Sequence, residues 1–305
     1  MQKHRFSISV NCYVPDETAV TDQVQDFEEC YEDHGFIMLP DQYSEDGAPT
    51  RLVINCHGAG GWVMADDAVV EHSNLTHYLV ANGYAVMDVN GLPAEYAAKL
   101  GVDIRYNIGS PIAVRSYVKA YHYCMEHFNL DPQVFVHGGS MGGLSGANLV
   151  LSGCIPVIAH SAFCPLLDPY NGLFLRQTKK GLGKEAICKL YQFEKDENGE
   201  YIYDEKKLMG FDPVRNQKAA CYPVPVKFWH CVDDHVVDFE ITQRFVNRIK
   251  ENGGTAYLRA FPYGKHGPKN VGTVQNPCGN TRFGDEEIEI TPAVEEAFIW
   301  IRNFS

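Results

Sequence analysis

The chain contains one short apolar run that breaks into glycines around a serine: Val134-Phe135-Val136-His137-Gly138-Gly139-Ser140-Met141-Gly142-Gly143. The apolar part is typical of a buried strand, and the residues after Ser140 continue in a helical pattern. A serine at a sharp strand-to-helix turn has a strained backbone, and its neighbours must be small where strand and helix pass closely. Gly138, Gly142 and Gly143 meet that need. The stretch therefore predicts a nucleophile elbow, with the Ser140 hydroxyl at a helix N-terminus that favours negative charge.

Composition limits the classes of protein to consider. The 305 residues are 45% hydrophobic and 12% aromatic, as in an ordinary globular protein, and no apolar run is long enough to cross a bilayer. The net charge of -13 opposes both a phosphate backbone and an anionic membrane surface. We therefore expect neither nucleic acid nor a membrane as a partner.

The termini and cysteines point to a cytoplasmic protein. The basic start at residues 1–7 is followed by polar and acidic residues instead of the apolar core of a signal peptide. The ten cysteines are scattered, without a C-x-x-C pair, which favours free thiols in a reducing compartment. Their spacing gives no reason to expect a metal site.

Strand-like and helix-like patterns alternate along most of the chain. Expected strands lie at 51–56, 84–89, 134–138, 156–163, 226–232 and 255–261, and expected helices at 67–82, 110–128, after 140, at 239–252 and at 292–304. Ser110 and Pro111 are typical of a helix start. This alternation predicts an α/β fold: a mostly parallel sheet with helices on both faces and ligands at the C-terminal ends of the strands.

Two segments fall outside the alternation. Residues 1–50 contain two short alternating stretches, at 6–14 and 35–39, which we expect to form edge strands or a hairpin. Residues 164–223 lose their periodicity and are rich in aromatic and charged residues. They are interpreted as a partly helical insert that caps the site, with a surface decoration as the alternative. No repeat or linker marks a second domain, so we expect a single domain over residues 1–305.

Three chemically suited residues follow strands, in the order Ser140, Asp233, His266. Acyl transfer by a serine needs a base for the hydroxyl proton, an acid that orients the base, and donors for the oxyanion. In this order and spacing the chain resembles the α/β-hydrolase family over residues 51–163 and 223–304. We interpret His266, in a glycine-flanked loop, as the base, because His235 lies too close to Asp233 to reach both it and Ser140.

The acid has competing candidates. The run Asp233-Asp234-His235-Val236 resembles the D-x-x-V pattern of prolyl-oligopeptidase-like hydrolases, which implies Asp233. Asp234 is the neighbouring alternative, Asp238 lies near the same strand end, and Asp168 follows the preceding strand at a position that some relatives use. Each of these aspartates can also serve only as a helix cap or turn residue.

The oxyanion donors are also assigned by resemblance. The family places one in the backbone N–H after the nucleophile, here Met141, and the other in the loop after the strand at 51–56. That loop, residues 57–61, resembles the HGGG-type loop of esterases with Ala59 as a departure, so the second donor is Gly58 or Ala59. His57 is interpreted as a structural residue of the loop. Trp62 is a candidate substrate-binding residue, with a packed aromatic as the equal alternative.

The sequence thus predicts a serine hydrolase that needs no metal or cofactor. Its leading form is a carboxylesterase that cleaves a small acyl or carbohydrate-linked ester through an acyl-enzyme on Ser140, with a small-molecule ester as substrate. A peptidase or amidase of prolyl-oligopeptidase-like type is the enzyme alternative, although the chain has no N-terminal propeller. A non-catalytic binding homologue and acyl transfer to an acceptor other than water are the remaining alternatives. A homo-oligomer is compatible with the sequence, which leaves the oligomeric state open.

Overall fold

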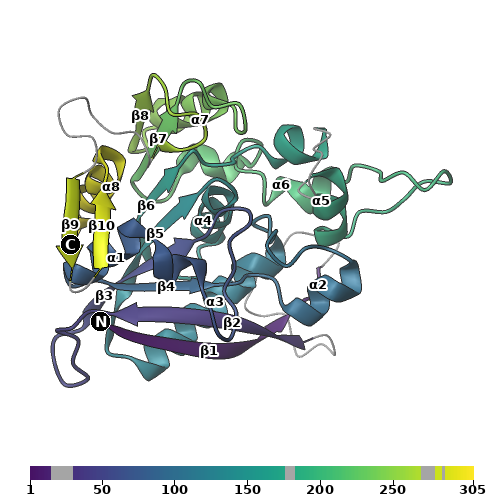
Figure 1. The fold of residues 1–305 in the computed structure, drawn as a ribbon. Helices are drawn as coiled ribbons and strands as arrows, with labels where there is room; N and C mark the ends of the chain where they lie inside the picture. The colour runs from purple at the N-terminus through teal and green to yellow at the C-terminus, as the bar shows by residue number, and fades with distance from the viewer. Residues whose placement is uncertain (15–29, 176–182, 269–278, 284–285) are drawn as a thin grey trace.

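The computed structural model describes residues 1–14, 30–175, 183–268, 279–283 and 286–305. Its centre is an eight-stranded sheet in the order β1-β2-β4-β3-β5-β6-β7-β8, flanked by helices on both faces (Figure 1). Within the described residues, no helix is long and apolar enough to cross a membrane. All nine described cysteines, which exclude Cys278, are free thiols, as the sequence predicted for them.

The N-terminal residues form the predicted hairpin at one sheet edge. Strands β1 (Gln2–Asn11) and β2 (Cys30–Leu39) pair antiparallel, with Phe6 opposite Gly35. The Phe6 ring packs over Gly35, which must be a glycine because a Cβ at this position would overlap the ring. Strand β2 then pairs antiparallel with β4, so the hairpin extends the main sheet.

The remaining strands are parallel, and their C-terminal ends therefore meet at one edge of the sheet. The strands with their bounds are β3 (Thr50–Cys56), β4 (Ala85–Val89), β5 (Leu130–Gly139), β6 (Val157–Phe163), β7 (Val226–Cys231) and β8 (Ala256–Phe261). These bounds lie within four residues of the expected ones, which confirms the mostly parallel sheet.

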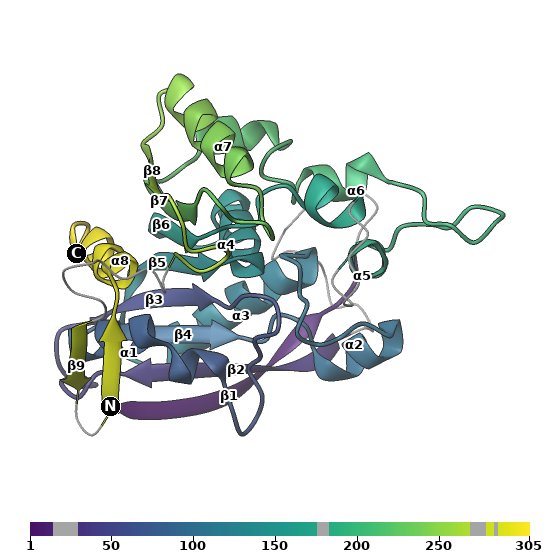
Figure 2. The same ribbon diagram turned by 45° about the horizontal axis from the view of Figure 1, so that its top comes forward.

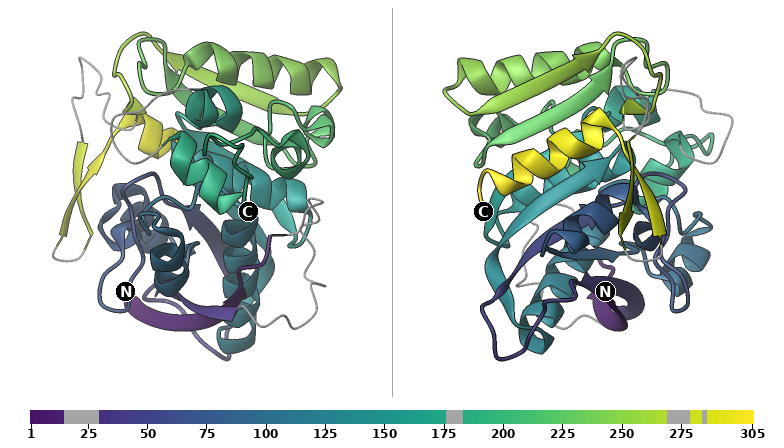
Figure 3. Two further views of the ribbon diagram at one scale, coloured as in Figure 1. Left: turned by 90° about the vertical axis from the view of Figure 1, so that its right-hand side faces the viewer. Right: turned by 60° about the vertical axis from the view of Figure 1, so that its left-hand side comes forward.

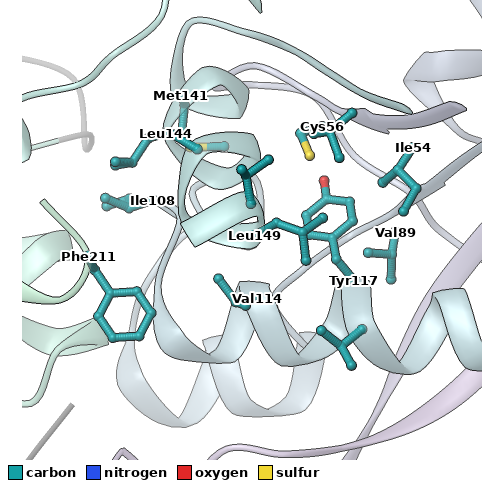
Figure 4. Packing of buried hydrophobic residues seen from close by; sticks show 14 of the residues in the cluster. Ile54, Cys56, Val89, Ile108, Val114, Tyr117, Met141, Leu144, Leu149 and Phe211 are labelled. Atoms are coloured by element: carbon teal, nitrogen blue, oxygen red, sulfur yellow. The ribbon is translucent and has the colours of Figure 1, made fainter. Parts of the chain in front are cut away.

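Helices cover both faces of the sheet, as predicted. One face carries α3 (Pro111–His127), α4 (Met141–Ser152) and α7 (Phe239–Glu251), whose buried side chains join the larger apolar cluster (Figure 4). The other face carries α1 (Asn74–Ala81) and α8 (Pro292–Arg302) with a second cluster (Figure 3). Helix α3 begins as expected, because the Ser110 side chain accepts a hydrogen bond from the Ala113 amide.

Some elements differ from the expected ones. The helix expected at 67–82 is divided into a 3-10 turn, η1 (Val69–His72), and α1, because Ser73 has extended backbone angles between them. A short helix, α2 (Ala94–Leu100), lies where none was predicted. Between the expected strand at 255–261 and the expected helix at 292–304, where no element was predicted, strand β9 (Gly279–Phe283) pairs antiparallel with β10 (Glu286–Ile290) in a separate two-stranded sheet.

The segment 164–223 is partly helical, as predicted. Its described elements are η2 (Tyr170–Phe174), α5 (Lys184–Leu190), α6 (Glu205–Met209) and η3 (Gln217–Cys221). Between α5 and α6 the chain projects from the body of the molecule (Figures 1 and 2). Hydrogen bonds join the segment to the main domain: Tyr191 donates to the Gly109 carbonyl, and the Asn148 side chain donates to the Phe211 carbonyl. Its role as a cap remains a prediction.

Three backbone segments pass very closely where β5 turns into α4. A side chain on Gly142 would overlap the Cys56 carbonyl at the end of β3, and one on Gly138 would overlap the Gly142 carbonyl. A side chain on Gly143 would overlap Pro165. The three glycines singled out in the sequence are therefore required for these contacts.

We expect Gly142→Ala to lower the free energy of unfolding by about 3 kcal/mol or more, because the added methyl group meets rigid backbone. Urea denaturation measures this. Gly139→Ala is the control from the same turn, since the atom nearest to an added Cβ there is 4.0 Å away. Equal stability of Gly142→Ala and Gly139→Ala would contradict the packing described.

Candidate active site

Ser140 lies at a strained turn between β5 and α4. Its φ of 53° and ψ of -117° are uncommon for a residue with a side chain. Hydrogen bonds hold the turn: the Ser140 amide donates to the Phe163 carbonyl at 2.9 Å, and the Ser140 carbonyl accepts from the amides of Gly143 and Leu166, each at 2.9 Å. The predicted nucleophile elbow is therefore present, with its backbone conformation fixed by neighbours on both sides.

His266 reaches Ser140 from the loop that follows β8. Its Nε2 lies 2.9 Å from Ser140 Oγ. The preceding residue, Lys265, has φ of 53°, so the chain turns sharply before His266. This is the geometry of a serine hydroxyl that donates to an imidazole base, and it agrees with the role predicted for His266.

The carboxylate beside His266 belongs to Asp234. Asp234 Oδ2 lies 2.8 Å from His266 Nδ1, and its side chain is completely buried. Asp233 is exposed, and its Oδ1 accepts a hydrogen bond from the Lys265 backbone amide at 2.8 Å instead of contacting the imidazole. The structure thus corrects the expectation that Asp233 is the acid. Asp233 holds the loop that carries His266, whereas Asp234 contacts the imidazole.

The D-x-x-V pattern fits this sequence in two registers, which explains the error. If the pattern begins at Asp233, its valine is Val236, which is 44% exposed. If the pattern begins at Asp234, its valine is Val237, which is buried. The second register is the structural one, because the Val236 and Val237 amides both donate to Asp234 Oδ1, at 2.8 and 3.0 Å.

His230 is a site residue that the sequence analysis missed. It is fully buried in β7, and its Nε2 lies 3.1 Å from Asp234 Oδ2 and 3.2 Å from the Val237 carbonyl. Both of these partners are acceptors, so Nε2 carries the proton, and Nδ1 then accepts from the Thr242 hydroxyl at 2.9 Å. A histidine inside an apolar strand, four residues before an aspartate, was the available signal.

The surroundings of Asp234 favour its ionised form. Burial alone would raise its pKa, but hydrogen bonds from His230, His266 and the amides of Val237 and Val236 outweigh burial and hold the pKa well below its usual range. Asp234 therefore keeps its charge at neutral pH. It can orient His266 and stabilise the imidazolium that forms when His266 takes the Ser140 proton.

The other acid candidates have structural roles. Asp168 is buried, accepts from the Asn171 amide and forms an ion pair with Arg215 at 2.6 Å. Asp238 caps α7 by accepting a hydrogen bond from the Glu240 amide. The alternative that each aspartate is a cap or turn residue is therefore correct for these two.

The residues expected to supply the oxyanion donors lie beside Ser140. Met141 is the first residue of α4, so its amide lacks an intrahelical partner. Gly58 packs against the nucleophile: a Cβ placed on it would lie 3.7 Å from Ser140 Cβ. Ala59 follows Gly58 and is exposed. The arrangement agrees with Met141 and Gly58 as donors, and Ala59 remains the alternative to Gly58.

Hydrogen bonds to the buried carboxylate of Asp88 fix the loop that carries Gly58 to the sheet. His57 Nδ1 lies 3.2 Å from Asp88 Oδ1, and Asp88 also accepts from the Asn55 side chain and the Tyr117 hydroxyl. Figure 4 shows Tyr117 reaching from α3 toward Cys56. His57 is thus the structural residue expected, because its ring ties the loop to the centre of the sheet.

Two further features complete the site. Trp62 is half-buried, and its indole N–H donates to Asp67 at 2.8 Å, so a substrate contact by Trp62 remains a prediction. Ligand-type atoms of Cys164, Asp234 and His266 lie within 4.8 Å of one another, and this is the one group of metal-ligating side chains found among the described residues. The last two are already hydrogen-bonded to each other.

Comparisons with known proteins identify the fold. No family model and no curated protein matches the sequence. Solved structures do match. The match with acylaminoacyl peptidase of Pyrococcus horikoshii has a TM-score of 0.57 and 12% sequence identity, and it covers 88% of this chain and 38% of the peptidase chain. The match with a puromycin-hydrolyzing peptidase of Mycobacterium tuberculosis has a TM-score of 0.59 and 18% identity, and it covers 78% of this chain and 35% of the peptidase chain. The match with dipeptidyl peptidase 4 of Porphyromonas gingivalis has a TM-score of 0.59 and 13% identity, and it covers 86% of this chain and 32% of the other.

These similarities support the fold prediction. The chain has the α/β-hydrolase fold and spans about a third of the length of the structures it matches. Within this fold, the contacts among Ser140, His266 and Asp234 have the geometry of a nucleophile, a base and an acid that orients the base.

We expect Asp234→Asn to lower kcat by about 10³-fold or more, because the amide favours the wrong histidine tautomer. Asp233→Asn is the matched control and removes the same charge one residue earlier. We expect it to lower kcat less than about tenfold, because the side-chain oxygen can still accept from the Lys265 amide. Steady-state kinetics with any hydrolysed substrate measures both. A larger loss in Asp233→Asn would contradict the assignment.

Proposed function

We propose that this protein is a serine peptidase or amidase that acts on short peptides or aminoacyl amides through an acyl-enzyme on Ser140. The observation that carries the proposal is the continuous set of contacts from Ser140 Oγ to His266 and from His266 to buried Asp234. The matched structures are those of peptidases, which favours amide over ester substrates.

Each residue has a defined role in the proposed reaction. His266 Nε2 takes the Ser140 proton as Oγ attacks the substrate carbonyl, and Asp234 stabilises the resulting imidazolium. The Met141 amide and that of Gly58 or Ala59 stabilise the oxyanion, each contributing about 3 kcal/mol at the transition state. His266 then protonates the leaving amine as the amide C–N bond breaks. In the second half of the reaction His266 takes a proton from water as the water oxygen attacks the acyl carbon, and it returns that proton to Ser140 Oγ as the ester bond to Ser140 breaks and the acid is released.

Amide cleavage depends strongly on His266 as an acid, because an amine is a poor leaving group until it is protonated. The buried contact with Asp234 keeps the ring oriented for both proton transfers. Ester hydrolysis by the same residues is the second candidate, which the similarity of residues 57–61 to an esterase loop favours.

A matched pair of substrates tests the proposal: N-acetyl-alanine 4-nitroanilide and N-acetyl-alanine 4-nitrophenyl ester, with alanine 4-nitroanilide as the free-amine counterpart. We expect at least one anilide to be hydrolysed, with the rate lowered more than about a thousandfold in Ser140→Ala. Release of 4-nitroaniline from the anilides and of 4-nitrophenol from the ester measures turnover. Ser140-dependent cleavage of the ester, with neither anilide cleaved, would instead identify an esterase.

A further inference from the structure

A cavity of about 300 Å³ lies beside the nucleophile and has no part in the proposed proton transfers. Its walls come from the C-terminal ends of β3, β5 and β6 and from residues of η1, α1 and α8. It therefore lies on the face of the sheet that carries α1 and α8 (Figure 3). Its volume is at the small end of the range for ligand pockets in proteins.

Glycines separate the cavity from Ser140. Gly58 and Gly139 both line it, and both are in direct contact with the nucleophile, Gly58 by packing and Gly139 by sequence. Apart from the two residues adjacent in sequence, the nearest atom to a Cβ built on Gly139 would be the Phe163 carbonyl oxygen, 4.0 Å away. No side chain of these two glycines therefore stands between the cavity and Ser140.

The cavity wall changes character from inside to outside. Its buried part includes the apolar side chains of Val70, Leu75 and Phe163 together with the buried rings of His57 and His137. Its outer part consists of half-buried Ser73 and Asn74 with exposed His72, whose ring pairs with Asp67 at 3.1 Å. Asn74 is the residue of this outer part that has a side-chain amide, which can donate to or accept from a polar group of a ligand.

We infer that this cavity is a substrate subsite that takes a short aliphatic group with a polar far end, and that Asn74 recognises that end. The inference rests on the proposed function, because it requires Ser140 to be the nucleophile. It assigns part of the specificity to η1 and the start of α1, whereas the segment 164–223 contacts the α2 and α4 side of the molecule.

Inactivation by phosphonofluoridates tests the subsite without depending on ester or amide preference. In this reaction Ser140 Oγ forms a bond to phosphorus, and the hydroxyl proton passes to His266. The P–F bond breaks, and fluoride leaves with the bonding electron pair. One reagent series varies the carbon-linked arm among methyl, n-butyl and 2-methoxyethyl, and a second varies the alkoxy arm in the same way. The two series distinguish a subsite for the acyl group from one for the leaving group. Intact-mass spectrometry gives the labelling rates.

Two variants should change the ratios between reagents in one series. Ser73→Trp narrows the outer opening, and we expect the butyl-to-methyl rate ratio to fall about tenfold, with Ser73→Ala as a control that retains the wild-type ratio. Asn74→Leu nearly conserves volume, and we expect the methoxyethyl-to-butyl ratio to fall about fivefold, as for the loss of one hydrogen bond. Ratios cancel any general loss of reactivity in a variant.

The outcomes separate the subsite from the proposed function. Wild-type ratios in Ser73→Trp in both series would overturn the subsite, and a wild-type methoxyethyl-to-butyl ratio in Asn74→Leu would overturn the role of Asn74. Labelling that follows the expected ratios in a protein that cleaves neither anilide would support the subsite and reject the peptidase. No labelling of Ser140 would overturn the nucleophile and, with it, the subsite.

Discussion

The close approach of Gly142 to the Cys56 carbonyl determines where the reacting groups lie. It brings the end of β3, the turn after β5 and the start of α4 together without side chains between them. The Ser140 hydroxyl, the Met141 amide and the loop of Gly58 consequently belong to one rigid unit. Such a unit can keep its donors fixed while charge develops on the substrate oxygen, which is the main requirement for an oxyanion site.

His266 joins this unit from a separate loop, which is fixed by two adjacent aspartates with different roles. Asp233 binds the Lys265 backbone, and Asp234 binds the His266 ring. Asp234 is in turn held by His230 and by two amides of its own turn. The loop position and the ring orientation are therefore controlled separately, although both depend on the end of β7.

Much of the fold could be predicted from the sequence because its signals are local. The glycines around Ser140 follow from backbone contact, and Ser110 with Pro111 marks the start of a helix. The choice between Asp233 and Asp234 depended on which valine of the next turn faces the interior, and two valines in succession left that ambiguous. His230 was missed because its role exists only once β7 and the His266 loop are in contact. The hairpin of β9 and β10 was missed because neither strand has a run of apolar residues.

The contact between His266 Nδ1 and Asp234 can be detected by proton NMR. A ring N–H that donates to a buried carboxylate resonates far downfield and exchanges slowly enough to be seen. His230 Nε2 also donates to Asp234, so His266→Ala is used to identify which downfield signal belongs to His266. We expect the His266 signal in the wild type and in Asp233→Asn, and its loss in Asp234→Asn. A His266 signal that persists in Asp234→Asn but disappears in Asp233→Asn would contradict this contact.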